Sequence, residues 1–226
     1  MNSKEYALIV AGGKGTRLKS KTPKQFLLLD GLPVLMHTIF AFCRYSKDIE
    51  VILVLPEGDI ETWKSLCNQH DFTHPVTLVA GGETRFQSVR NGLKKIQGDG
   101  LVAIHDGVRP LVSESIIAAS FQFAAIHQSA VAAVPLKESI RMINDDGTQA
   151  VDRSKFRIIQ TPQTFKVSVI KDAYESKEEA TLTDDASVVE KAGHVISIFE
   201  GSYENIKITT AEDLIVADAL MKARHQ

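Results

Sequence analysis

A glycine-rich segment, ALIVAGGKGTRLKSKTPKQFLLL at residues 7–29, limits the choice of fold more than any other part of the chain. It begins with an apolar run, Ala7–Val10, of the kind that forms a buried strand. The glycines of the loop that follows are Gly12, Gly13 and Gly15. Glycines let backbone N–H groups point at an anion, and Arg17 and Lys24 place positive charge nearby. The segment therefore predicts a strand that leads into a phosphate-binding loop.

Two common glycine motifs do not match this loop. A dinucleotide-binding loop has a third small residue where this chain has Leu18, and a P-loop has Ser or Thr where it has Gly15. An ordinary turn between a strand and a helix is the simpler alternative. The cations on both sides favour a triphosphate site, because a turn does not need them.

Along the rest of the chain, apolar strand-like runs alternate with segments of helical period. We expect strands at residues 7–10, 50–55, 75–80, 101–104, 130–134, 158–165, 195–199 and 205–209. We expect helices at residues 33–45, 59–69, 84–96, 113–128, 183–189 and 211–223, with Thr84, Ser113 and Thr183 as N-caps. This alternation predicts a single α/β domain over residues 1–226, with a mostly parallel sheet flanked by helices.

Residues 136–158 depart from this pattern. β-branched and polar residues alternate there on both sides of Asp146-Gly147, which is a typical hairpin turn. The segment predicts a β-hairpin arm that leaves the sheet. Because a two-stranded ribbon is barely stable alone in water, we expect the arm to pack on a second subunit.

Polar residues follow two of the expected strands. Gly81-Gly82 precedes Arg85 and Ser88, which could read a flat ring that lies on the glycines; a tight turn is an equally good reading. Asp106 follows a central strand, where open α/β sheets bind ligands. It could hold Mg²⁺ or a hydroxyl group, or it could simply pair with Arg109.

Three further groups have simpler explanations. His105 has no nearby ligand partner, so we expect a structural role for it. Asp184 and Asp185 fall in the first turn of an expected helix, where acidic residues match the helix dipole. Lys207 lies between two isoleucines on an expected strand, and the residues alone favour a solvent-facing side chain.

The composition narrows the classes of partner. With a formal net charge of -2, the chain lacks the excess of basic residues expected of a protein that binds a nucleic acid polymer or an anionic membrane. Apolar runs fall short of the roughly 20 residues that span a bilayer, and the first residues lack an apolar signal region, so we expect a cytoplasmic protein. Cys43 and Cys67 are far apart, and we expect both to be reduced thiols.

Several motifs together resemble one family, the 2-C-methyl-D-erythritol 4-phosphate cytidylyltransferases. The motifs are AGGKGTRL, TPKQFL, GGETRFQSVRNGL, HDGVRP, VDR, QTPQTF, TDDAS and NIKITTAEDL, and they cover nearly the whole chain. The resemblance implies a Rossmann-like fold, a homodimer joined through the arm at residues 136–158, and dependence on Mg²⁺. It implies condensation of CTP with 2-C-methyl-D-erythritol 4-phosphate to give 4-diphosphocytidyl-2-C-methyl-D-erythritol and pyrophosphate.

The resemblance also implies roles for individual residues. Arg17 and Lys24 would stabilise charge on the α-phosphate, while Arg153 and Lys207 would position the acceptor. The place of the arm suggests that Arg153, with Ser139, reaches the partner's site. The residues implied to line the acceptor pocket are Asp106, Arg109, Ser139, Thr161 and Thr183. The residues implied to hold CTP are Ala11, Gly12, Gly13, Gly15, Gly82, Arg85 and Ser88. The candidate metal ligand, Asp106, comes from the residues rather than from the resemblance.

The chain departs from the usual pattern of the family at Glu83, where aspartate is frequent, and at Gly107, where alanine is usual. A ribitol-5-phosphate cytidylyltransferase shares several motifs, but Asp185 and Ser187 favour the methylerythritol family. A nicotinamide-dependent reductase is disfavoured by Leu18. A non-catalytic nucleotide sensor would not need four cations from separate loops.

Overall fold

A central sheet of seven strands organises the computed structural model, which describes residues 3–12 and 22–224. The order across the sheet is β11-β7-β10-β6-β1-β4-β5. The bounds are β1 Glu5–Val10, β4 Glu50–Leu55, β5 Thr77–Ala80, β6 Leu101–Asp106, β7 Ser129–Pro135, β10 Arg157–Lys166 and β11 Ile198–Glu200. β10 runs antiparallel to both of its neighbours, and the other adjacent pairs are parallel. The mostly parallel sheet that the sequence predicts is confirmed.

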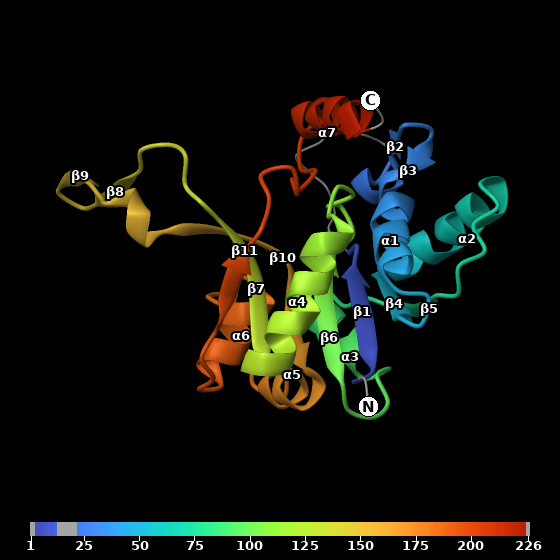
Figure 1. The fold of residues 1–226 in the computed structure, drawn as a ribbon, viewed down its shortest axis with the longest axis horizontal. Helices are drawn as coiled ribbons and strands as arrows, with labels where there is room; N and C mark the ends of the chain where they lie inside the picture. The colour runs from blue at the N-terminus through green and yellow to red at the C-terminus, as the bar shows by residue number, and fades with distance from the viewer. Residues whose placement is uncertain (1–2, 13–21, 225–226) are drawn as a thin grey trace.

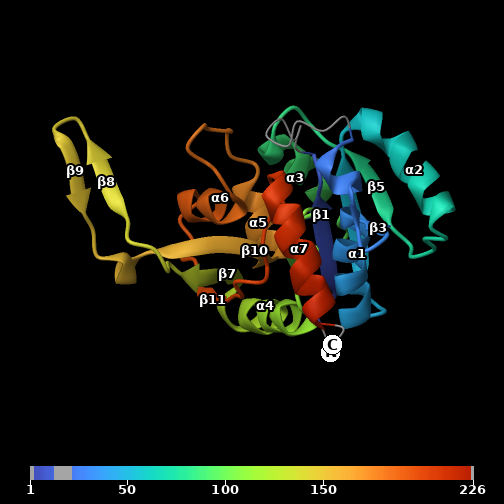
Figure 2. The ribbon, with the colours of Figure 1, turned by 90° about the horizontal axis from the view of Figure 1, so that it is seen from above.

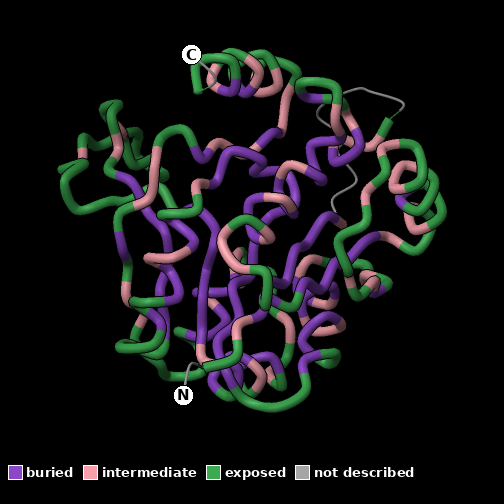
Figure 3. The backbone as a smooth tube through the Cα atoms, turned by 45° about the vertical axis from the view of Figure 1, so that its right-hand side comes forward, coloured by how far each residue is buried: buried purple, intermediate pink, exposed green. Residues whose placement is uncertain are grey.

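Helices cover both faces of this sheet (Figure 1, Figure 2). One layer contains α1 Val34–Tyr45, α2 Ile60–Gln69 and α4 Glu114–His127, and the other contains α3 Arg85–Leu93, α5 Val167–Ala173 and α6 Asp185–Lys191. Along β1 the side chains alternate between the layers, since Ile9 packs in the first core and Leu8 in the second. Figure 3 accordingly shows the buried residues gathered in the interior of the molecule.

A third apolar cluster lies under α7, Ala211–Arg224, which crosses the top of the molecule in Figure 1. Ala217 and Met221 of this helix pack there against Ile208, Val108 and Leu29. Near it, β2 Leu28–Leu29 and β3 Leu32–Pro33 form a short antiparallel ribbon. The described residues also contain three short 3-10 helices: η2 Lys24–Phe26, η3 Glu57–Asp59 and η4 Arg153–Lys155.

The predicted hairpin is present as β8 Arg141–Asn144 and β9 Gly147–Ala150. Gly147 has a φ of 131°, a conformation that favours glycine at this turn. Figure 2 shows the two strands well away from the body of the molecule. Apolar side chains on the arm face solvent, with Ile143 82% exposed.

Several element boundaries predicted from the sequence are wrong. Residues 205–209, all of them described, form a loop rather than a strand, because Asn205 is buried and its side-chain amide donates to the Thr161 carbonyl. The N-cap of α6 is Asp184 rather than Thr183, since Asp184 and Ser187 form a reciprocal capping box. The strand expected from residue 195 begins at Ile198, the strand expected from residue 75 begins at Thr77, and α3 ends at Leu93.

Within the described ranges, none of the helices combines the length and apolarity that crossing a bilayer requires. Cys43 and Cys67 are both free thiols, as expected. The cytoplasmic location stays a prediction.

Candidate functional site

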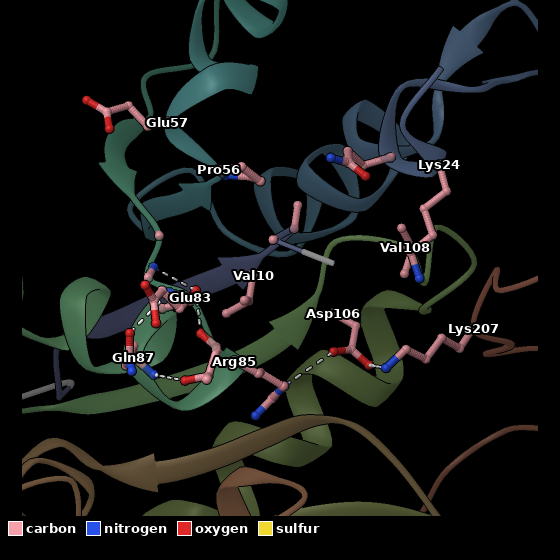
Figure 4. Close-up of a pocket in the computed structure, with 17 residues that line it drawn as sticks. Val10, Lys24, Pro56, Glu57, Glu83, Arg85, Gln87, Asp106, Val108 and Lys207 are labelled. Carbon is pink, nitrogen blue, oxygen red and sulfur yellow. Dashed lines mark hydrogen bonds and ion pairs between the residues drawn. The ribbon is translucent and has the colours of Figure 1, made fainter. Parts of the chain in front are cut away.

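A pocket of about 1000 Å³ opens where β1, β4, β5 and β6 end (Figure 4). These are the carboxyl ends of parallel strands, at which open α/β sheets bind ligands. The residues that line it are Val10, Ala11, Gly12, Lys24, Gln25, Pro56, Glu57, Gly81, Gly82, Glu83, Thr84, Arg85, Gln87, Ser88, Asp106, Val108 and Lys207. The pocket thus brings together residues from six separate parts of the chain.

One wall of the pocket is the loop between β5 and α3. Thr84 caps α3 by accepting a hydrogen bond from the Gln87 backbone N–H, as predicted. The hydroxyl of Ser88 accepts from the Gly82 N–H at 3.1 Å and donates to the Thr84 carbonyl at 2.9 Å. A Cβ at Gly81 would lie only 2.9 Å from the Ser88 hydroxyl. The two glycines are therefore needed for close packing of the loop on the helix, and they also leave bare backbone at the pocket wall.

Asp106 lies at the centre of a cluster of positive charges. Its Oδ2 is 3.0 Å from Lys207 Nζ and 3.4 Å from Arg109 Nε, and its Oδ1 is 3.8 Å from Arg85 Nε. Burial alone would raise the pKa of Asp106, but the positive charges of Arg85, Lys207 and Arg109 hold it well below its usual range. The pairing of Asp106 with Arg109 is thus present, and Asp106 nevertheless lines the pocket.

Lys207 points into the pocket rather than to solvent. Its ammonium group contacts Asp106, and Figure 4 shows Lys24 extending toward the same region from above. The reading from the residues alone, that Lys207 faces solvent, is wrong. The reason is that its segment is a loop whose Ile208 N–H donates to the Val108 carbonyl, beside the pocket.

Arg85 is held from outside the pocket by Asp185. Its two terminal nitrogens donate to the two carboxylate oxygens of Asp185, at 2.8 and 2.6 Å. Asp185 is fully buried and also accepts from the Tyr174 hydroxyl at 2.6 Å. Burial opposes a charged guanidinium, but the charges of Asp185 and Asp106 raise the pKa of Arg85 above its ordinary value. From the sequence, Asp185 is interpreted as an acidic residue that matches a helix dipole, and its pairing with Arg85 is not predicted.

Gln25 is a second residue that the sequence reading missed. It lines the pocket beside Lys24, is 1% exposed, and its amide donates to Asp59 at 2.8 Å. This bond ties η2 to η3, two elements that both border the pocket. The sequence feature that could have identified Gln25 as a site residue is its position directly after Lys24 in the TPKQFL motif.

Other predicted site residues lie next to the pocket rather than on its surface. The Thr161 hydroxyl accepts from the Asp106 N–H at 3.1 Å, and Arg109 donates to the Asn205 carbonyl at 2.7 Å, so both brace the pocket from behind. Thr183 is an exposed residue before α6. His105 is fully buried, with its ring edge against Phe42, and burial lowers its pKa to about 4, as a structural role requires.

Two predicted residues belong to the arm. Ser139 and Arg153 are exposed, and the Arg153 guanidinium donates to the Lys137 carbonyl at the base of the arm. The predictions for Gly13, Gly15 and Arg17 concern residues outside the described part of the chain. At Gly107, a methyl group would lie 2.9 Å from both the Ala11 Cβ and Leu35 Cδ1, which accounts for glycine in this chain.

The described side chains contain no group of three or more His, Cys, Asp or Glu residues that could hold a metal ion by themselves. Three carboxylates line the pocket, those of Glu57, Glu83 and Asp106, and Asp106 is the one predicted to hold a metal. Because Arg85, Arg109 and Lys207 already contact both oxygens of Asp106, this carboxylate could supply at most one ligand, and a magnesium ion here would be bound mainly by substrate phosphates.

Comparisons with known proteins agree over nearly the whole length of the chain. Residues 6–223 match the family model described as 2-C-methyl-D-erythritol 4-phosphate cytidylyltransferase. Proteins of that name from Bacteroides thetaiotaomicron and Porphyromonas gingivalis are 45% and 47% identical, over 96% and 98% of this chain and 100% and 99% of theirs.

Solved structures give the same result. The 4-diphosphocytidyl-2C-methyl-D-erythritol synthase of Anaerococcus prevotii is similar with a TM-score of 0.83 and 30% identity, covering 97% of this chain and 96% of its own. The 2-C-methyl-D-erythritol 4-phosphate cytidylyltransferase of Thermus thermophilus has a TM-score of 0.76 and 29% identity, over 98% and 100%. These matches span the sheet, the pocket and the arm together.

Proposed function

Because the chain belongs to the 2-C-methyl-D-erythritol 4-phosphate cytidylyltransferase family, we propose that the pocket at the ends of β1, β4, β5 and β6 is its active site. The protein is a cytidylyltransferase that condenses CTP with 2-C-methyl-D-erythritol 4-phosphate and releases pyrophosphate. The observation that carries the assignment of the site is the convergence of Lys24, Arg85 and Lys207, from three separate parts of the chain, on one pocket.

The chemistry suits such a set of cations. A phosphate oxygen of the acceptor attacks the α-phosphorus of CTP, the bond from that phosphorus to the β-phosphate oxygen breaks, and pyrophosphate leaves. The acceptor phosphate is already ionised at neutral pH, so the reaction needs no general base. What it needs is relief of the repulsion between two anions, which fixed positive charges supply.

The walls of the pocket suggest where each substrate binds. The bare backbone of Gly12, Gly81 and Gly82 suits the nucleoside of CTP, and Lys24 suits its triphosphate. Lys207 suits the acceptor phosphate. Arg17 belongs to the same proposal through its place in the glycine loop.

We propose Mg²⁺ as the cofactor, held by triphosphate oxygens with Asp106 as the protein ligand. When bound, Mg²⁺ would withdraw charge from the triphosphate and help to orient it. Lys207, Arg85 and Arg109 already face Asp106, so this carboxylate also holds the protein's own cations in place.

We further propose a homodimer in which the arm of each subunit reaches the other subunit's pocket with Ser139 and Arg153. Support comes from the exposed apolar side chains of the arm and its base, which an isolated chain would leave in water. They are Met142, Ile143, Phe156, Ile158 and Ile159.

The test of the proposed function is pyrophosphate release from CTP and Mg²⁺, with 2-C-methyl-D-erythritol 4-phosphate compared with ribitol 5-phosphate. We expect turnover that is selective for the first acceptor and falls by about 10²–10³ in kcat in Lys24→Ala, by analogy with the loss of one transition-state donor. A preference for ribitol 5-phosphate would move the protein to another pathway. Full activity of Lys24→Ala would remove Lys24 from the mechanism.

A further inference from the structure

A chain of hydrogen bonds and ion pairs runs from the helical layer into the pocket. The Tyr174 hydroxyl donates to Asp185, Asp185 binds both terminal nitrogens of Arg85, and Arg85 Nε lies 3.8 Å from Asp106 Oδ1. Asp185 is fully buried at the start of α6, whereas the Arg85 side chain is 30% exposed and lines the pocket. Asp185 thus fixes the position of Arg85, and Arg85 also contacts Asp106.

We propose that Asp185 is a positioning residue for the reaction: it fixes the Arg85 guanidinium so that Asp106 stays available to Lys207. The inference rests on the function proposed above. Asp185 itself does not touch substrate in this scheme, because it acts through Arg85.

The geometry of the guanidinium carries the argument. A planar guanidinium that shares two parallel hydrogen bonds with a carboxylate has only one direction in which to point. With that edge occupied by Asp185, only Nε of Arg85 faces Asp106, and at 3.8 Å the contact is loose. Asp106 Oδ2 therefore keeps its closer contact with Lys207 Nζ, at 3.0 Å.

Without Asp185, the released guanidinium would be the strongest competitor for Asp106. It would form a close pair with Asp106 or bind the substrate phosphates directly. In either case Lys207 would lose the partner that holds its ammonium group in the pocket. We therefore expect the acceptor side of the reaction to suffer more than CTP binding.

The experiment is a double-mutant cycle with Asp185→Asn, Arg85→Gln and the double variant, measured by pyrophosphate release. We expect Asp185→Asn to lower kcat/KM for the acceptor by tenfold or more and to change KM for CTP less than threefold. In the Arg85→Gln background, the same substitution should change kcat/KM less than twofold, since its target is gone. Wild-type kcat/KM in folded Asp185→Asn, or an equal loss in both backgrounds, would overturn the proposal.

Thermal unfolding of the same variants separates positioning from a merely structural role. Arg85→Gln leaves the buried Asp185 charge unpaired, so Tm should fall by about 5–10 °C. The double variant removes that charge and should regain most of the loss, while its kcat/KM stays at the level of Arg85→Gln. Activity that returned together with Tm would overturn the proposal.

Two tyrosines provide a matched control. Tyr174→Phe removes one hydrogen bond to Asp185 and should lower kcat/KM for the acceptor about threefold. Tyr45→Phe removes a comparable bond to Glu5, away from the pocket, and should leave kcat/KM unchanged. If the wild type released no pyrophosphate, the proposed function would fail by itself. In that case, calorimetry would measure acceptor binding by the same variants in place of kcat/KM. Acceptor binding that was unchanged in Asp185→Asn would overturn the positioning role.

Discussion

At the scale of the residue, Asp106 pairs with three cations, of which Arg85 and Lys207 line the pocket. Asp106 is nearly buried, and its pairing with Arg85, Arg109 and Lys207 keeps it ionised. Removing it would leave the cations facing one another in a pocket that must bind two anionic substrates. A negative charge in an anion-binding pocket is therefore useful, because it fixes where the positive charges point.

This arrangement makes stability depend on pH. The pKa of Asp106 is lowered in the folded protein, so its contribution is fully present above the unfolded value of about 3.9 and is lost as pH falls toward the folded pKa. We expect Asp106→Asn to lower the free energy of unfolding at pH 7, and the difference from wild type to shrink as the pH falls below about 4, with a slope that approaches about 1.4 kcal/mol per pH unit near pH 3. Denaturant unfolding from pH 3 to pH 7 measures it. A difference that stayed constant over this range would contradict the pairing.

At the scale of the element, the turn between β5 and α3 joins packing to binding. Gly81 and Gly82 press on the first turn of α3, and Thr84 caps the same helix. Local strain at this turn would move the bare backbone that faces the pocket. The geometry of the proposed nucleotide site thus depends on the N-terminus of α3.

We expect Gly82→Ala to raise KM for CTP about tenfold and to lower stability by about 1–3 kcal/mol, because the new methyl group would overlap the Gln87 Cβ. Gly58→Ala is the matched control, since Gly58 lies beside the pocket in η3 and a Cβ there meets nothing within 4 Å. Steady-state kinetics with CTP varied would measure both. Equal KM values for the two variants would remove the Gly82 loop from the nucleotide site.

At the scale of the whole molecule, the arm gives the chain two separated parts. The pocket lies in the α/β body. In the arm segment, Ser139 lies just before β8 and Arg153 lies in η4, after β9. If the arm completes the site of a partner, each active site contains residues from two chains. The quaternary structure would then be part of the catalytic machinery.

Mixing of subunits tests this arrangement. Arg153→Ala and Lys24→Ala should each be nearly inactive alone, but a mixture that exchanges subunits should regain about a quarter of wild-type activity, because half of its dimers would hold one intact site. Light scattering should show dimers for both. The absence of any regain in exchanged mixtures would place Arg153 in the site of its own chain.

The apolar face of the arm gives a second test at this scale. Ile143→Asp puts a charge on the most exposed apolar side chain of the hairpin and should shift the protein toward monomer, with a parallel loss of turnover. Asp145→Asn, at an exposed position of the same hairpin, is the control and should stay dimeric. Sedimentation would report the state, and a dimer unaffected by Ile143→Asp would show that the arm is not the interface.

Much of this protein follows from patterns that are local in the chain. Apolar runs, helical periods, the caps Thr84 and Ser113, and the Asp146-Gly147 turn suffice for the layers, the arm and the position of the pocket, because each depends on neighbours a few residues away. The ion pairs inside the pocket do not follow from such local patterns. Arg85 and Asp185 are 100 residues apart, and Asp106 meets Lys207 only after α7 and the loop at residues 205–209 pack above β6. Whether a charge faces solvent, caps a helix or holds another charge depends on burial and on long-range packing, which local spacing does not encode.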